Sequence, residues 1–159
     1  MVRPLADRHY SRQSPGTPNF VPPGRHFVLY AETASGSAYW VTTHQYPKYI
    51  KHFWPYAWNC SAFRNEGAGL SSDLIRQAVS ASRHMLGPAP PQGMITFVDP
   101  SAIKKTNRPG WCFLKAGFKD IGKTDKGLVV LQMLPDLMPV PLPPRPSLDD
   151  EWSLHRRGV

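Results

Sequence analysis

Two short stretches of the sequence carry side chains that can move protons. In the first, Asp7 to Arg12, an imidazole, a phenol and a hydroxyl (His9, Tyr10 and Ser11) lie between two arginines. Histidine titrates near neutral pH, which makes His9 a candidate base, although a His-Tyr pair is more often structural than catalytic. The second is Asp99, which follows a short apolar run. A carboxylate at a strand end is well placed for acid-base chemistry, but Asp-Pro also commonly begins a turn.

A third stretch could bind an anion. Residues 58–63 have the aromatic, small and β-prone side chains of a half-buried strand, and Gly67 and Gly69 then allow a sharp turn. Ser71 and Ser72 can cap the helix that follows. A helix N-terminus after a glycine-bearing turn offers N–H groups and a positive dipole end to a phosphate. A plain strand-to-helix connection fits the same two glycines equally well.

The helix predicted after this turn is amphipathic. Its apolar residues recur at helical spacing on one face, at Leu70, Leu74, Ile75, Ala78 and Val79. Arg83 and His84 suit its last turn, and Gly87-Pro88 supplies a stop signal. Such a helix must bury its apolar face against a sheet.

The remaining elements are predicted from their residue patterns. They are a helix or turn over residues 4–11, an antiparallel pair of strands at 26–30 and 38–43 around a loop at 32–37, a strand at 94–98, a short helix at 111–118 closed by Gly117, and a strand, turn and strand over 119–133. This order implies an α/β (α+β) fold with a mixed sheet and helices on its faces.

The composition bounds the function classes. With 159 residues and 41% hydrophobic content, the chain can fold as one domain, and a wholly disordered chain is excluded. Its net charge of +8 favours a polyanionic partner, nucleic acid before membrane, while ordinary solubility is the alternative. The start lacks the apolar core of a signal peptide, and no run is long enough to cross a bilayer, so a cytoplasmic location is expected.

Two segments combine basic and aromatic side chains that suit nucleic acid. The basic loop at 101–110 holds the candidate phosphate contacts Lys104, Lys105 and Arg108. Stacking on bases could come from Trp54 and Tyr56, in the aromatic stretch 46–56, and from Trp111. The stretch 46–56 could equally be a loop that covers a core.

Cys60 and Cys112 are expected to be free thiols, because two cysteines without paired neighbours do not make a structural zinc site. A nucleophilic cysteine partnered by a histidine is the minor alternative. From Leu134 onward the composition changes to the polyproline-like run 138–146 and a polar end. The predicted organisation is therefore a domain over 1–134 and a proline-rich tail over 135–159, which acts as a linker or as an extended partner-binding segment.

The order of these elements resembles the GNAT family of N-acetyltransferases. This resemblance rests on the strand, glycine turn and helix over 63–79, followed by a further strand, the short helix ending in Ala116-Gly117-Phe118 and a last strand. It implies a mostly antiparallel central sheet flanked by helices. It also implies that acetyl-CoA binds along the central strand with its pyrophosphate at the helix start, near the cofactor-binding candidates Phe63, Arg64, Asn65, Gly67, Gly69, Ser71 and Ser72.

More narrowly, four short motifs are similar to those of the phage Mom DNA-modification proteins. They are His9-Tyr10-Ser11, Phe63-Arg-Asn-Glu66, Thr96-Phe-Val-Asp99 and an aromatic residue followed by Lys115-Ala-Gly-Phe118. The resemblance spans residues 5–133 and leaves the tail outside. It implies a transferase that adds an acyl or acetamido-type group to the exocyclic amine of adenine in DNA, which protects the DNA from restriction in the host cell cytoplasm.

In that family the match gives catalytic roles to His9, Tyr10, Ser11 and Asp99. A His-Tyr-Asp set could hold a metal ion, for which iron is one candidate, as well as relay protons. One departure concerns the block after Asp99, where relatives carry a tyrosine and this chain has Trp111 and Phe113, neither of which donates a phenolic proton. Two other functions stay open: an N-acetyltransferase for a small-molecule or protein amine, and a basic DNA-binding accessory protein without catalysis.

Overall fold

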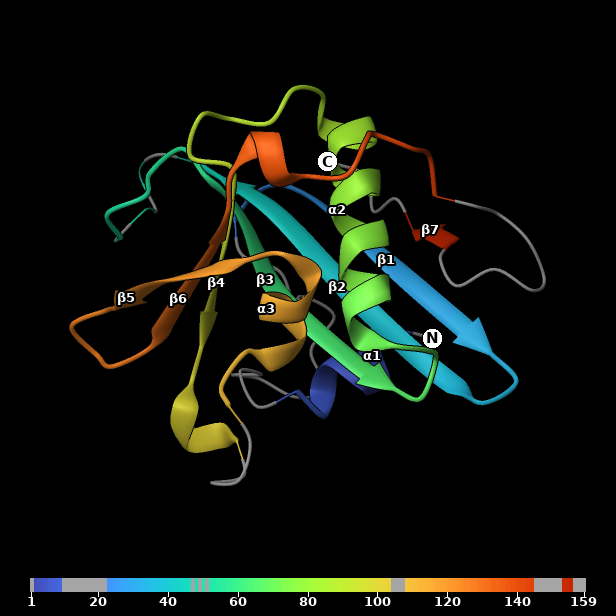
Figure 1. Ribbon diagram of the computed structural model, residues 1–159. Helices are drawn as coiled ribbons and strands as arrows, with labels where there is room; N and C mark the ends of the chain where they lie inside the picture. Colours follow the sequence, from blue (N-terminus) through green and yellow to red (C-terminus); the bar gives the residue numbers. More distant parts are fainter. Residues whose placement is uncertain are drawn as a thin grey trace.

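The computed structural model describes residues 2–9, 23–46, 48, 50, 52–103, 108–144 and 153–155. Within this part of the chain, one sheet carries seven strands in the order β5-β6-β4-β3-β2-β1-β7 (Figure 1). The strands are β1 (Gly24–Thr33), β2 (Gly36–Gln45), β3 (Trp58–Glu66), β4 (Met94–Val98), β5 (Lys119–Lys123), β6 (Val129–Met133) and β7 (Ser153–His155). The helices are α1 (Val2–Asp7), α2 (Ser71–Leu86) and α3 (Trp111–Ala116), with 3-10 turns η2 (Pro100–Ala102) and η3 (Pro135–Leu137).

The sheet is mixed and mostly antiparallel. β1, β2 and β3 follow one another as antiparallel neighbours, and α2 then crosses over so that β4 runs parallel to β3. The hairpin of β5 and β6 returns with β6 between β4 and β5, antiparallel to both. These pairings confirm the predicted α+β class, the antiparallel hairpin and the mixed sheet with helices on its faces.

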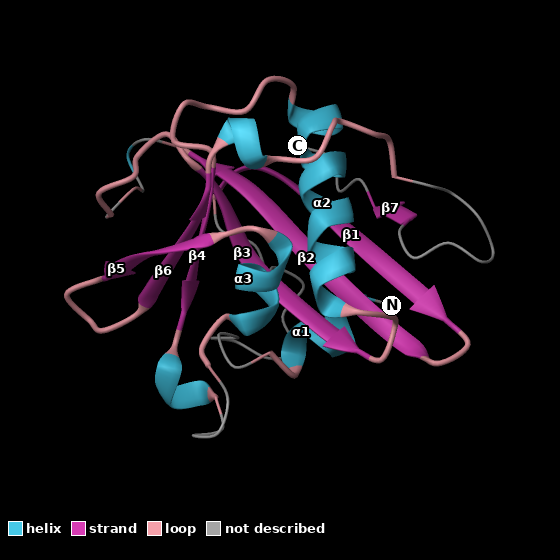
Figure 2. Ribbon diagram, viewed as in Figure 1, coloured by secondary structure: helices cyan, strands magenta, loops and turns pink. Residues whose placement is uncertain are grey.

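Helices cover both faces of the sheet, as Figure 2 shows. The larger core lies between the sheet and α2 and α3, where Trp40 and Leu74 are fully buried. The smaller core lies under α1, whose Leu5 and Ala6 pack with Tyr39 and other side chains of β1 and β2. Alternate residues of β1 and β2 therefore pack in different cores, because successive side chains in a strand point to opposite faces.

The turn between β1 and β2 is shorter than the predicted loop at 32–37. The ladder continues to Glu32 opposite Ser37 and Thr33 opposite Gly36, which leaves two residues for the turn. The small residues serve packing here, because a Cβ atom at Gly36 would lie 1.9 Å from the carbonyl oxygen of Glu66. The predicted loop was therefore two residues too long at each end. At Gly36 the reason is that a glycine required for close strand approach was taken as a turn residue.

The start of α2 differs from the prediction that Ser71 and Ser72 cap it. Its N-cap is Leu70, and no side chain bonds the cap position. The turn is organised from β3 instead, because the Asn65 carboxamide accepts from the amides of Gly67 (3.1 Å) and Ala68 (2.9 Å). The same side chain donates to the Gly69 carbonyl and to the Ser71 hydroxyl. The predicted stop at Gly87 is confirmed, with its amide bonded to the Arg83 carbonyl.

The first part of the predicted tail lies against α2. The Ser80 hydroxyl donates to the Val140 carbonyl and accepts from the Leu142 amide. Arg83 donates to the Pro139 carbonyl at 2.8 Å, and Met138 is buried with only 7% of its surface exposed. The polyproline-like run is held by these bonds because its own carbonyls have no partner within a regular element.

Candidate active-site cavity

The strands β3 and β4 separate after three residue pairs. They pair from Trp58 opposite Met94 to Cys60 opposite Thr96. At that point the register between β2 and β3 shifts, and Ser61 is the extra residue of a β-bulge. A bulge bends its strand, so β3 turns away from β4 beyond Cys60. The Thr96 hydroxyl donates to the Cys60 carbonyl at 3.0 Å and makes the last link between the two strands.

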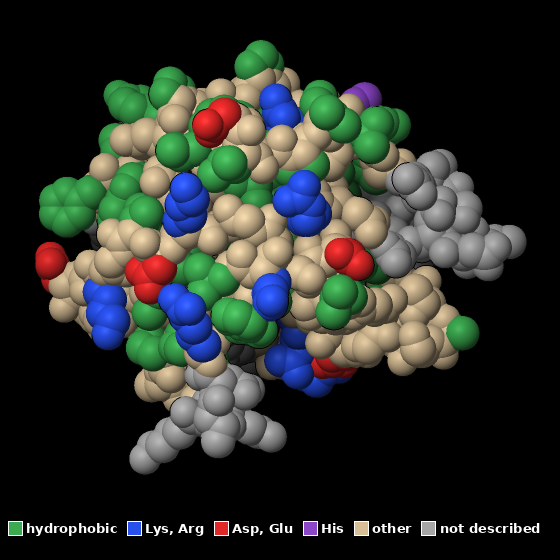
Figure 3. Space-filling model, in the orientation of Figure 1, with side chains coloured by type: hydrophobic (Ala, Val, Ile, Leu, Met, Phe, Trp, Pro, Cys, Tyr) green, Lys and Arg blue, Asp and Glu red, His purple; other side chains and the backbone are tan. Residues whose placement is uncertain are grey.

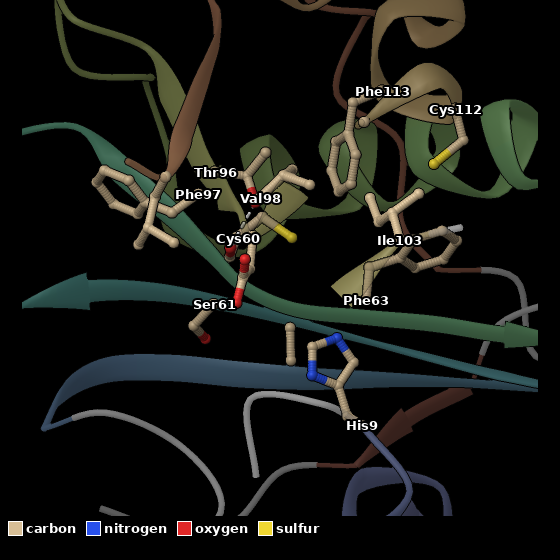
Figure 4. Close-up of a pocket in the computed structure, with 14 residues that line it drawn as sticks. His9, Cys60, Ser61, Phe63, Thr96, Phe97, Val98, Ile103, Cys112 and Phe113 are labelled. Carbon is tan, nitrogen blue, oxygen red and sulfur yellow. Dashed lines mark hydrogen bonds between the residues drawn. The ribbon is translucent and has the colours of Figure 1, made fainter. Parts of the chain in front are cut away.

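A cavity of about 450 Å³ fills the space that the diverging strands leave (Figure 4). It is lined by residues of β3 (60–63), of β4 and its end (96–99), of the start of α3 (110, 112 and 113), and by His9, Ile103 and Leu128. The sequence-predicted residues His9, Phe63 and Asp99 thus meet at one cavity, although they come from three separate parts of the chain.

His9 is held at the cavity by the end of α1 and by β3. Its amide bonds to the Ala6 carbonyl at 3.0 Å, which closes the last turn of the helix. Its ring stands edge-on to Tyr39, with 6.3 Å between the ring centres, and is hydrogen-bonded to the backbone of Phe63. Burial lowers the pKa of the imidazole and the nearby Arg64 charge lowers it further, while the bond to Phe63 acts in the opposite direction. His9 is therefore neutral at pH 7 and able to accept a proton.

Asp99 begins a turn, the alternative that the Asp-Pro pair also predicted. Its carboxylate accepts from the Ser101 amide at 2.8 Å and from the Ser101 hydroxyl at 2.7 Å, so it caps the 3-10 turn η2. These bonds lower the pKa of Asp99. A carboxylate held in its ionised form is a poor proton acceptor, so between the two residues His9 is the better base.

The wall of the cavity toward α3 is apolar and carries two thiols. Cys60 is buried and Cys112 is half-buried, and both are free cysteines, as predicted. Burial raises the pKa of both thiols. A nucleophilic cysteine needs a lowered pKa, so the geometry argues against the minor alternative of cysteine chemistry.

The predicted cofactor-binding residues follow one strand and the turn after it. Phe63 lines the cavity, and its ring packs against Trp40 and Phe113. Arg64 points to the opposite face, where it bonds to the Glu66 carboxylate at 2.6 Å and to the Arg8 carbonyl. The other predicted residues are not among the lining ones: Asn65 lies near the end of β3, Gly67 and Gly69 lie in the turn, and Ser71 and Ser72 begin α2.

The predicted nucleic-acid contacts are spread over the surface. Tyr56 is 62% exposed, and Arg108 is exposed next to the cavity residue Gly110. Trp111 is half-exposed on α3, with the Lys115 ammonium 4.9 Å from the centre of its ring. Basic side chains are scattered over the face that carries α2 and α3, as Figure 3 shows. The candidates Tyr10, Ser11, Lys104 and Lys105 lie outside the described residues.

Trp54 is the predicted stacking residue that the structure brings to the cavity. It packs against Phe97, a cavity residue, with 6.3 Å between ring centres, and His52 packs against the same ring at 5.3 Å. Sequence reasoning did not select Phe97 or His52. The alternation of β4 could have drawn attention to Phe97, which shares a sheet face with Asp99.

Within the described residues, no three His, Cys, Asp or Glu side chains are grouped so that they could hold a metal ion. In the same part of the chain no helix has the length and apolar character needed to cross a membrane. No protein-family model, curated protein or solved structure gives a significant match to this chain.

Proposed function

We propose that the protein is a GNAT-like transferase of the phage Mom type, which modifies the exocyclic amine of adenine in DNA with an acyl or acetamido-type group, and that with acetyl-CoA as the donor the transferred group is an acetyl group. The observation that carries this proposal is the separation of β3 from β4 at the Ser61 bulge, which opens a cavity lined by His9. The strand order, with β6 between β4 and β5, supports the GNAT-like fold that the sequence suggested.

The open edge of β3 is suited to hold the reacting carbonyl of a donor. Among the described residues, β3 pairs with β4 only as far as Cys60, and His9 bonds to the backbone of Phe63 beyond that point. Backbone amides at such an edge stabilise a negative charge that develops on a carbonyl oxygen. The apolar wall of Phe63, Val98 and Phe113 excludes water, which strengthens this interaction.

The start of α2 is suited to hold the diphosphate of the donor. The helix has no side-chain cap, so its first turn presents amides to an external acceptor. The amides of Gly67 and Ala68 are already bonded to Asn65, which restricts the proposed anion contacts to the residues that follow them. Three residues of β3, about 10 Å of extended chain, separate Phe63 from the turn that begins at Gly67.

His9 is the proposed general base. As the amine attacks the donor, a bond forms between the amine nitrogen and the donor carbon, and the bond from that carbon to the leaving sulfur breaks. The neutral imidazole of His9 takes the proton that the amine loses, and this proton then neutralises the leaving thiolate. Asp99 holds the turn η2 beside the cavity instead of taking this proton.

Two measurements test the proposal against its rivals. Calorimetry with acetyl-CoA should show binding, which a DNA-binding accessory protein would lack. Mass spectrometry of nucleosides from DNA co-expressed with the protein should show a modified adenosine, which a small-molecule acetyltransferase would not produce. The variant His9→Gln should bind acetyl-CoA but yield no modified nucleoside. An undiminished amount of modified nucleoside from this variant would contradict the proposed role of His9 as the base.

A further inference from the structure

A row of aromatic rings leads from the cavity to the protein surface. Phe97 lines the cavity, and Trp54 and His52 pack against its ring. Phe53 stands edge-on to Trp54, with 6.3 Å between the ring centres and 89° between the ring planes. Three of these rings come from the connection between β2 and β3, and the fourth comes from β4.

The outer end of this row is exposed to an unusual degree. The side chain of Phe53 is 81% exposed, while Trp54, His52 and Phe97 are partly buried. A ligand that covers this ring would recover the free energy of burial that the exposed benzene ring forgoes, and the ring adjoins the ring of Trp54 instead of standing singly on the surface. The exposed ring therefore argues for a ligand that covers it.

The position of the row fits a planar ligand that reaches His9. Phe97 and His9 line the same cavity, so a ligand that contacts Phe97 in this cavity lies within reach of His9. Aromatic side chains bind nucleobases without regard to sequence, since every base has a π face that can stack on a ring. The net charge of +8 supplies attraction for the phosphates that such a base carries with it.

We propose that Phe53, Trp54 and Phe97 form a stacking site for one unpaired nucleobase, which delivers the amine of the base to His9. The delivery of the amine to His9 rests on the proposed function, whereas binding of the base does not. The other two predicted stacking residues lie apart from the row. Trp111 packs with Lys115 on α3, and the ring contacts that join the row do not include Tyr56.

The test uses the full chain without acetyl-CoA and a single-stranded oligonucleotide that carries one 2-aminopurine, whose fluorescence falls when it stacks on an aromatic ring. The wild type should bind it at low salt with quenching. Phe53→Ala should weaken binding about tenfold, as loss of one stacking partner does, and should reduce the quenching. Because Phe53 is 81% exposed, this variant should fold normally, which circular dichroism checks.

Tyr56→Ala and Trp111→Leu are the matched controls, since both remove an exposed aromatic ring outside the row. They should bind the oligonucleotide like the wild type. Equal losses in Phe53→Ala and the controls would mean that exposed rings contribute wherever they lie, which would overturn the stacking site. Unchanged binding by Phe53→Ala would mean purely electrostatic binding and would overturn it as well. Sedimentation that shows a dimer for the wild type and a monomer for Phe53→Ala would assign the row to self-association instead.

The calorimetric titration with acetyl-CoA distinguishes failure of this inference from failure of the proposed function. Acetyl-CoA binding without base quenching would overturn the stacking site and leave the donor site intact. Base quenching without acetyl-CoA binding would support the stacking site and overturn the proposed transferase.

Discussion

The Arg64 guanidinium donates a hydrogen bond of 2.7 Å to the main-chain carbonyl of Arg8, the residue that precedes His9. Both arginines also bind the carboxylate of Glu66, which lies at the end of β3. The end of α1 is thereby fixed to the strand that opens the cavity. Because His9 follows directly, its position at the cavity depends on these contacts as well as on its own bond to Phe63.

The first prediction concerns the pKa of His9 in the variant Arg64→Gln. Removal of Arg64 releases the Arg8 carbonyl and also removes a positive charge that lowers the pKa of His9. Both effects should raise this pKa toward 6.5. The measurement is an NMR titration of the histidine ring signals, with His9→Gln used to assign the His9 signal. Arg76→Gln is the control, since Arg76 also donates to a main-chain carbonyl, that of Ala116, and its loss should leave the His9 titration unchanged.

The second prediction concerns stability below neutral pH. Burial lowers the pKa of His9 and of His52 in the folded protein, so between pH 6.5 and these lowered values the unfolded chain binds more protons. The free energy of unfolding should therefore fall as the pH drops through this window. Urea denaturation at pH 7.5 and 5.5 measures the effect, and His9→Gln should make the difference smaller. Equal free energies of unfolding at the two pH values would contradict this prediction.

The second prediction extends to Glu66, which should affect stability in a separate and more acidic pH range. The guanidinium groups of Arg8 and Arg64 lower its pKa from 4.5 to about 2, so its ionised form contributes to stability above pH 4.5. That contribution should be lost as the pH falls from about 4.5 to about 2. The loss should be small, because the pair lies at the surface and is screened by solvent. Glu66→Gln should remove this acid-sensitive part, whereas Glu32→Gln, at another exposed glutamate, should keep it.

The third prediction concerns thiol reactivity. Cys60 and Cys112 line the cavity, and burial raises the pKa of both, so alkylation by iodoacetamide at pH 8 should be slow in the folded protein and fast in urea. Cys112 is the more exposed of the two and should react first. If acetyl-CoA occupies the cavity, it should slow this reaction further. Mass spectrometry of the alkylated chain gives the rates, and rapid modification of native Cys60 would disagree with the buried position.

The fourth prediction concerns the segment after β6. Met138 is 7% exposed, and its replacement by alanine should lower the free energy of unfolding by about 2 to 3 kcal/mol, as large-to-small changes in a core do. Leu137, its neighbour in sequence, is 41% exposed, and Leu137→Ala should change stability by less than about 1 kcal/mol. Equal effects of the two substitutions in urea denaturation would show that this segment does not belong to the core.

Much of the fold could be predicted from local patterns. The spacing of the apolar residues in 70–79 predicted a buried helix face. The glycine at 117 predicted a helix C-cap, and its φ of 109°, a conformation that favours glycine, confirms it. The strands β1 to β6 follow from runs of β-prone residues between turn signals. Boundaries were less certain, as at the β1–β2 turn and at the α2 start, because Gly36 and Asn65 have roles set by segments far away in sequence.

The sequence by itself determined the element order, the basic charge and the candidate residues His9, Phe63 and Asp99, because each of these depends on residue type and short-range spacing. Only the tertiary structure decided that the three residues meet at one cavity, that Asp99 caps a turn while His9 stays neutral, and that Trp54 joins a row of rings through Phe97. The physical reason is the bulge at Ser61: it is defined by the register of β3 against β2, a relation between distant segments that no local pattern contains.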